Sequence, residues 1–141
     1  MFMGEYHHNI DDKGRLIMPS KFREDLGESF VVTRGIDACL YVYKLSTWND
    51  ITNKLNELSF TKKDVRSFQR FLLSGAAVTT LDKLGRLSIS SPLLNYANIE
   101  KECAIIGVND RIEIWNKNSF DNFLADNMNN ISDIAENLFE V

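Results

Sequence analysis

Residues 10–16, Ile-Asp-Asp-Lys-Gly-Arg-Leu, decide the fold of this chain, because residues 81–87 repeat the pattern as Leu-Asp-Lys-Leu-Gly-Arg-Leu. An apolar run ending in glycine and an alternating aromatic segment follow each copy. These segments lie at 30–35 and 40–43 in the first half and at 103–107 and 112–115 in the second. Two copies indicate one pseudo-twofold domain, since a solenoid needs three or more units.

The length and composition predict one hydrophobic core. A chain of 141 residues with 44% hydrophobic content buries one core and not two independent ones. No linker rich in Gly, Pro or Ser divides it, so we expect a single fused domain over 1–141. Its parts are assigned as a first repeat at 5–50, a connecting helix at 61–75, a second repeat at 76–123 and an acidic C-terminal helix at 124–141.

The apolar runs are short and match neither a signal peptide nor a membrane span, so a cytoplasmic protein is expected. Cys39 and Cys103 lie in apolar, strand-like runs and not at equivalent positions of the repeat. Reduced, buried thiols are the ordinary interpretation of such cysteines.

The net charge of −4 is concentrated at the C-terminus. Residues 119–141 carry Asp121, Asp126, Asp133, Glu136 and Glu140 and no Lys or Arg; the rest of the chain has 16 basic and 15 acidic residues, or +1. Phosphate capture depends on local clustering of cations, so the acidic sum does not exclude a DNA site. It does argue against strong non-specific DNA binding.

Each copy of the repeated stretch predicts a β-hairpin, because a polar turn with a glycine separates two apolar segments. The paired segments are expected at 6–10 with 15–18 and at 78–81 with 86–89. Pro19 and Pro92 then predict short helices, the first ended by Gly27. The other predicted elements are strands at 30–34, 39–43, 103–107 and 111–115, helices N-capped by Ser46 and Asn118, and helices over 62–74 and around 131–139.

Lys62, Arg66 and Arg70 are spaced at i, i+4 and i+8 along the helix expected at 62–74. This basic stripe is typical of a solvated or ion-paired helix surface, which is the favoured interpretation. Contact with the acidic tail of a neighbouring subunit is the alternative.

The pattern lacks the groups of an active site. His7 and His8 are the only histidines, and on a strand neighbours point to opposite faces, so they do not easily join one site. With two scattered cysteines they give no zinc-ligand spacing, and no glycine-rich phosphate loop occurs. The paired carboxylates Asp11 and Asp12 lie in a turn, where such residues more often cap backbone amides. We therefore expect no enzymatic activity, metal, cofactor or small-molecule substrate.

The repeated Asp-x-x-x-Arg, Asp11 with Arg15 and Asp82 with Arg86, is the one constellation with a plausible shared task. Arginine at the exit of a turn can offer a planar fork of donors to a phosphate or to the O6/N7 edge of guanine. The aspartate could hold that guanidinium or the turn backbone in place. Alternatively, each pair is a surface ion pair that only stabilises its own turn and contributes about 0–1 kcal/mol to the stability of the fold. The pattern alone favours neither.

A conjunction of motifs gives the chain a family resemblance. They are Met1-Phe2-Met3-Gly4, Asp11-x-Lys13-Gly14-Arg15-Leu16-x-x-Pro19-x-x-x-Arg23, Arg66-x-x-Gln69-Arg70-x-Leu72, Gly75-Ala76, Asp82-x-x-Gly85-Arg86-Leu87-x-Ile89, and Ile106-Gly107 ahead of Ile114-Trp115. Over nearly its whole length the sequence resembles the MraZ family, bacterial transcriptional regulators built from two SpoVT/AbrB-type repeats.

The resemblance implies an α+β fold with a mainly β core: a pseudo-twofold, swapped-hairpin β-barrel with peripheral helices. It further implies ring-like homo-oligomers that bind double-stranded DNA at repeated promoter elements upstream of the division and cell-wall gene cluster, and hence a nucleoid-associated protein. The DNA-contact motif of the family falls on Asp11/Arg15 and Asp82/Arg86. Lys13 and Lys83 are expected to add phosphate contacts.

The second copy departs from the family pattern at two positions. Where many members carry proline and then arginine, this chain has Ser91 and Leu94, so only the first copy retains the basic residue, Arg23. Arg23 is therefore included in the expected DNA-binding set. The second half is expected to hold phosphate less firmly.

The alternative function comes from a different class, an antitoxin-like protein-interaction module, since AbrB-like folds also serve as antitoxins that bind a toxin partner. The acidic, amphipathic helices expected over 119–141 could contact a protein. We expect instead that Phe120, Phe123 and Leu124 pack against the barrel.

Overall fold

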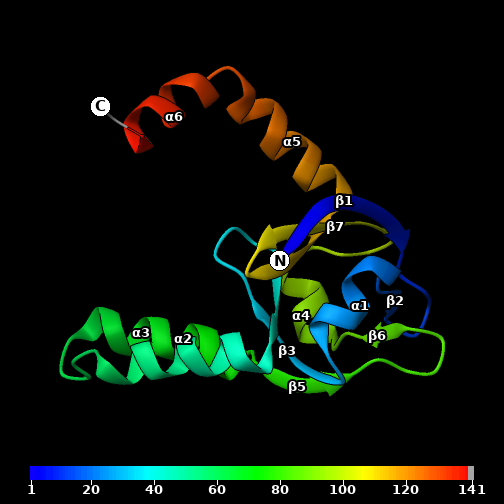
Figure 1. Cartoon of the computed structure of the whole chain (residues 1–141), viewed down its shortest axis with the longest axis horizontal. Helices are drawn as coiled ribbons and strands as arrows, with labels where there is room; N and C mark the ends of the chain where they lie inside the picture. The colour runs from blue at the N-terminus through cyan, green and yellow to red at the C-terminus, as the bar shows by residue number, and fades with distance from the viewer. Residues whose placement is uncertain (140–141) are drawn as a thin grey trace.

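Within residues 1–139, which the computed structural model describes, eight strands form two antiparallel sheets flanked by six helices (Figure 1). The strands are β1 (Phe2–Asn9), β2 (Arg15–Ile17), β3 (Ser29–Arg34), β4 (Leu40–Lys44), β5 (Ala77–Thr80), β6 (Arg86–Ser88), β7 (Glu102–Asn109) and β8 (Arg111–Asn116). The helices are α1 (Ser20–Leu26), α2 (Leu45–Glu57), α3 (Lys63–Ser74), α4 (Ser91–Tyr96), α5 (Lys117–Met128) and α6 (Ile131–Leu138). The expected α+β class with a mainly antiparallel β core is confirmed.

The two halves of the chain exchange strands. The larger sheet has the order β1-β7-β8-β4-β3-β5, so β1 pairs with β7 of the second half, and its counterpart β5 pairs with β3 of the first. The counterparts β4 and β8 meet at the centre, and β2 and β6 form the second sheet with each other. Every repeat thus completes its sheets with strands of the other repeat.

The predicted local hairpins are therefore wrong, although their turns form. The amide of Asp11 donates to the carbonyl of Arg15 at 2.9 Å, and that of Asp82 to Arg86 at 3.0 Å. Beyond each turn the flanking strands separate and pair elsewhere. The same turn sequence can join two paired strands or two strands that pair with other partners. Strand β1 pairs with β7 because this eight-residue ladder satisfies far more backbone hydrogen-bonding groups than pairing with the three-residue β2 could.

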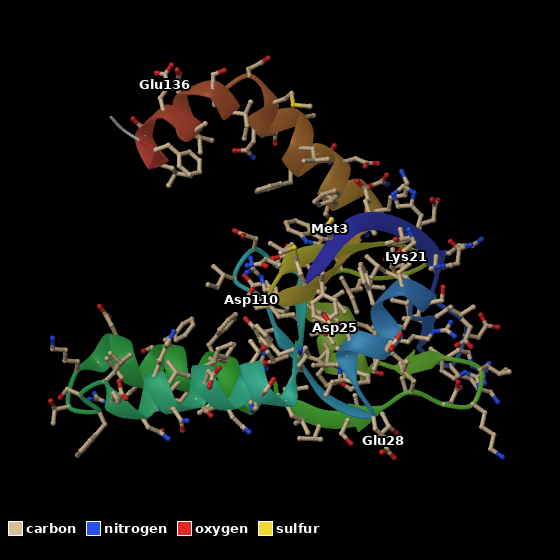
Figure 2. All side chains as sticks on the ribbon, viewed as in Figure 1. Met3, Lys21, Asp25, Glu28, Asp110 and Glu136 are labelled. Atoms are coloured by element: carbon tan, nitrogen blue, oxygen red, sulfur yellow. The ribbon has the colours of Figure 1, made fainter. Side chains whose placement is uncertain are left out.

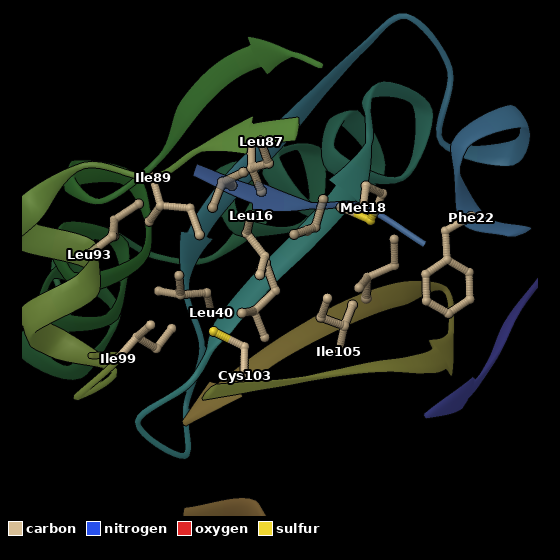
Figure 3. Close-up of a cluster of buried hydrophobic side chains, with 14 of the residues drawn as sticks. Leu16, Met18, Phe22, Leu40, Leu87, Ile89, Leu93, Ile99, Cys103 and Ile105 are labelled. Atoms are coloured by element: carbon tan, nitrogen blue, oxygen red, sulfur yellow. The ribbon is translucent and has the colours of Figure 1, made fainter. Parts of the chain in front are cut away.

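One core joins the two halves. Leu16 of β2 and Leu87 of β6 are directly opposite each other and fully buried (Figure 3). They belong to a cluster that includes Phe30, Leu40 and Ile105 from both halves of the larger sheet. Because the cluster contains side chains of both repeats, neither half has a complete core of its own.

The opposite face of the larger sheet is aromatic. Tyr41, Tyr43 and Trp115 alternate with the inner residues of β4 and β8, as the period of two requires. The Phe120 ring packs edge-on against Trp115 at 5.4 Å, and the Phe123 ring lies 5.3 Å from Trp115. These two contacts agree with the expected packing of Phe120 and Phe123 against the strands, whereas the contact expected of Leu124, which is 41% exposed, stays a prediction.

Helix ends differ from prediction where strands run directly into helices. Ser46 and Asn118 are not N-caps: α2 starts at Leu45 and α5 at Lys117, with no loop after the strand. The cap of α5 is Asn116, whose Oδ1 accepts a hydrogen bond from the Ser119 amide. Gly27 ends α1 as predicted, at φ +85°.

The acidic C-terminal helix expected at 124–141 is divided. Residue 124 lies inside α5, which ends at Met128, and α6 runs from Ile131 to Leu138. Residues 140–141, including Glu140, lie outside the described part of the chain.

Both cysteines are free and buried, as expected. Burial raises the pKa of Cys39 to about 12 and that of Cys103 to about 11, so both remain thiols at neutral pH. Among residues 1–139, no helix combines the length and apolar character that a bilayer crossing requires.

The shared core predicts a single cooperative unfolding transition. Leu16→Ala should lower the free energy of unfolding by about 2–5 kcal/mol because it leaves a cavity between the halves. Trp48 lies in the first half and Trp115 in the second, so urea titrations of Trp48→Phe and Trp115→Phe backgrounds follow each half separately. Leu16→Ala should lower the midpoint by the same amount in both backgrounds.

The control is Leu84→Ala, whose side chain is 67% exposed and whose loss should change stability by less than about 0.5 kcal/mol. A Trp115 transition that stays in place while the Trp48 transition shifts would contradict a shared core.

Candidate nucleic-acid interface

The first Asp-x-x-x-Arg turn is held by one carboxylate. Asp11 Oδ1 accepts the amides of Lys13 and Arg15, both at 2.9 Å, and Asp11 Oδ2 accepts Arg15 Nε at 2.8 Å. Gly14 adopts φ +75°, which closes the turn. A single side chain therefore fixes both the loop backbone and the guanidinium that leaves it.

The second turn repeats this arrangement atom for atom. Asp82 Oδ1 accepts the amides of Leu84 and Arg86 at 2.9 Å, and Asp82 Oδ2 accepts Arg86 Nε at 2.7 Å. Gly85 adopts φ +77°. The sequence repeat is thus a repeat of local geometry.

The ladder of β2 with β6 brings the two turns together. Arg15 is opposite Ser88, and Arg86 is opposite Ile17, at the two ends of a three-residue antiparallel pairing. Arg86 Nη1 lies 4.0 Å from Asp11 Oδ2, the carboxylate of the other turn. Two motifs 71 residues apart in the chain therefore form one site.

The guanidinium groups are partly accessible. The side chains of Arg15 and Arg86 are 28% and 24% exposed. Each uses Nε for its own aspartate, and within residues 1–139 no hydrogen bond engages the Nη atoms of either. The two Nη groups of an arginine form the forked edge that recognises phosphate or guanine O6 and N7.

Hydrogen bonding keeps both carboxylates ionised. The amide of Arg15 is the largest cause that lowers the pKa of Asp11, and the amide of Arg86 does the same for Asp82, with the arginine side chains adding to the effect. The folded-state pKa lies below the ordinary 3.8, so this stabilisation is present above that value and is lost only as pH falls through the lowered one. At neutral pH the clamp is intact.

Arg23 lies at the second turn and not at the first. A Cβ on Gly85 would clash with the Arg23 guanidinium carbon, so Arg23 lies directly against that glycine, and its Nε donates to the Met18 carbonyl at 2.8 Å. A Cβ on Gly14 would instead meet the Ile89 carbonyl oxygen at 2.9 Å and the Leu94 Cδ1 at 3.5 Å. Helix α1 of the first repeat thus packs against the turn of the second, and α4 against the turn of the first.

This crossed packing bears on the expectation that the second half holds phosphate less firmly, which stays a prediction. The first turn is the one that lacks the additional cation, because its neighbour is Leu94. Sequence reasoning missed this since it assigned each helix to the turn that precedes it in the chain. A spacing of 71 relates Arg23 to Leu94, but it cannot show that the helices exchange partners.

Lys13 and Lys83 are exposed in their turns, at positions that the repeat does not relate. Lys13 precedes Gly14 directly, whereas Leu84 holds that place in the second turn and Lys83 comes one residue earlier. The two lysines therefore extend from different points of the two loops.

Two further polar clusters lie outside the turns. His7 Nε2 contacts Glu5 at 2.6 Å, and in the described chain no group of three or more His, Cys, Asp or Glu residues is arranged to hold a metal. Arg111, stacked 4.9 Å from the Tyr41 ring and bonded to Glu113, lies on the aromatic face of the sheet.

The repeats also define the family of the chain. The family model described as "MraZ protein, putative antitoxin-like" matches twice, at residues 1–71 and 72–141. Together the matches cover the whole sequence, and the boundary between them falls within α3. The chain belongs to the MraZ family.

Proposed function

We propose that this protein is a sequence-specific, double-stranded DNA-binding transcription regulator and not an enzyme. The observation that carries the proposal is the pair of identical Asp–Arg clamps that one short ladder places side by side. If each aspartate served only to stabilise its turn, the hydrogen bonds from the backbone amides to Oδ1 would be sufficient. Fixing Nε as well holds each partly exposed guanidinium in one orientation, which lowers the entropic cost of recognition.

In this mechanism Arg15 and Arg86 read base edges while the surrounding cations contact phosphates. Arg23 supports the second turn, and Lys13 and Lys83 reach from the loops to the DNA backbone. The two aspartates contribute indirectly, by holding the arginines in one rotamer. The acidic residues of the C-terminal part, Asp121, Asp126, Asp133 and Glu136, lie on α5 and α6, away from the turns (Figure 1).

Few cations per chain imply weak binding by one subunit, since each phosphate contact releases about one counterion. We propose that ring-like homo-oligomers supply the remaining affinity by presenting several identical sites to repeated promoter elements. Membership of the MraZ family supports the division and cell-wall gene cluster as the target and the nucleoid as the location. The shared core between the two sheets supports closure of the strands into a swapped-hairpin barrel.

Arg15→Ala and Arg86→Ala should each weaken specific DNA binding by about 1–3 kcal/mol, because each removes one forked donor from a base edge. The measurement is a gel shift with the DNA upstream of the protein's own gene. Lys54→Ala on α2 is the matched control for loss of a cation elsewhere, and thermal melts check folding. Unchanged shifts for both arginine variants at unchanged melting temperature would overturn the proposal.

Arg23→Ala should weaken binding to all sequences alike and lower the slope of log K against log salt by about one counterion, because it removes a phosphate contact. Leu94→Arg should raise that slope by placing a cation beside Gly14 at the first turn. Salt titrations of binding measure both. Equal slopes in wild type and both variants would show that neither position faces phosphate.

A further inference from the structure

The two repeated turns carry opposite charges at equivalent positions. The 71-residue repeat relates Asp12 of the first turn to Lys83 of the second, and Lys13 to Leu84. All four side chains are exposed. Because both turns are held by the same hydrogen bonds, these side chains leave the backbone at equivalent places. The backbone of the site is therefore pseudo-symmetric, whereas its surface charge is not.

The carboxylate of Asp12 has no structural task in the described chain. Within residues 1–139, no hydrogen bond or ion pair engages the side chains of Asp12, Lys13 or Lys83. An aspartate that stabilises a turn accepts backbone amides, and in the first turn Asp11 accepts them. Turn formation thus accounts for Asp11 and not for Asp12.

The net charge of the two turns differs by two units. Each Asp–Arg clamp is neutral, so the difference depends on the remaining side chains. At the first turn Asp12 and Lys13 cancel, and Leu94 adds no charge. At the second turn Lys83 and Arg23 contribute one positive charge each, or +2. Adjacent residues lie well within the Debye length of about 8–10 Å, so Asp12 largely offsets the attraction of Lys13 for a phosphate.

Charges elsewhere in the described chain do not remove this difference. On α1, which packs against the second turn, Lys21 and Glu24 have opposite charges, and Asp25 pairs with Lys44 at 3.2 Å. Helix α4, beside the first turn, has no charged residue. Figure 2 shows Glu136 of α6 extending into solvent far from β2 and β6, so screening removes its effect at the turns.

We infer that the second turn is the sequence-independent anchor of the duplex and that Asp12 prevents the first turn from holding phosphate by itself. The inference rests on the proposed DNA binding and assigns unequal shares of it to the two turns. A duplex of any sequence is held by Lys83 and Arg23. The first turn contacts it only where hydrogen bonds from Arg15 to base edges outweigh the repulsion between Asp12 and phosphate. Asp12 is thus a specificity-determining residue, because an unpaired charge disfavours the wrong partner.

This assignment is opposite to the expectation from the sequence, in which the second half holds phosphate less firmly. That expectation compared Arg23 with Leu94 and did not include the exchange of Asp12 for Lys83. Each turn has one exposed lysine, so variants of Lys13 and Lys83 distinguish between the two assignments.

The first test measures affinity for a duplex of scrambled sequence by fluorescence anisotropy at low salt. Lys83→Ala should lower this affinity about threefold, the effect of one unit charge about 6 Å from a phosphate in water. Lys13→Ala should lower it less, because scrambled DNA does not approach the first turn while Asp12 is charged. In an Asp12→Asn background, Lys13→Ala should lower the affinity as much as Lys83→Ala does. Lys54→Ala on α2 is the control for loss of a cation elsewhere.

The second test exchanges the two charges. Asp12→Lys with Lys83→Asp keeps the net charge of the chain at −4 and moves the excess of two cations to the first turn. Each turn receives the residue that the other already has at that position, so the melting temperature should stay unchanged. In the exchanged protein Lys13→Ala should lower the affinity for scrambled DNA about threefold, and Arg23→Ala should lower it less than in the wild type.

Equal effects of Lys13→Ala and Lys83→Ala in the wild type would overturn the inference. So would an unchanged dependence on Arg23 in the exchanged protein.

The outcomes separate this inference from the proposed function. Specific binding that requires Arg15 and Arg86 but depends equally on the two lysines would overturn the inference alone. Equal affinity for scrambled and upstream DNA, unchanged in both arginine variants, would overturn the reading function, and the lysine variants would still decide where the anchor lies. A wild type that binds neither duplex would overturn both.

Discussion

The pairing of β2 with β6 is the constraint on which the rest depends. It joins the two strands that leave the repeated turns, and it places Leu16 opposite Leu87 in the shared core. The same six residues set the spacing of Arg15 and Arg86 at the surface. Hydrophobic burial on one side of this ribbon therefore positions charged groups on the other, so stability and the proposed recognition have a common origin.

Strand exchange makes the site a property of both repeats at once. Each turn is packed by a helix from the opposite half, with Arg23 at Gly85 and Leu94 at Gly14. The backbone is pseudo-symmetric while the side chains at the two turns differ. A duplex bound across both turns would meet Arg23 beside one turn and Leu94 beside the other, which gives the proposed contact a polarity that the repeat alone does not suggest.

Local features were predictable from the sequence, whereas the pairing of strands and the packing of helices between the two halves were not. The glycine turns, the helix end at Gly27 and the buried thiols follow from local chemistry, the family resemblance implied the α+β class, and the 71-residue repeat indicated the pseudo-twofold. The hairpins failed because a turn does not specify which strand pairs beyond it. Ser46 and Asn118 failed as caps because β4 and β8 continue into helices without a loop. The position of Arg23 was missed for the same reason as the hairpins, since it depends on exchange between halves.

The central claim is that two clamped arginines, set by one cross-repeat ladder, read double-stranded DNA. Mapping the genomic DNA that this protein protects in cells tests it most directly. The account predicts protection at repeated elements ahead of the division and cell-wall cluster, and loss of that protection when Arg15 and Arg86 are both replaced by Ala in a chain that still folds. Protection that is absent in the wild type, or identical in the double variant, would contradict it.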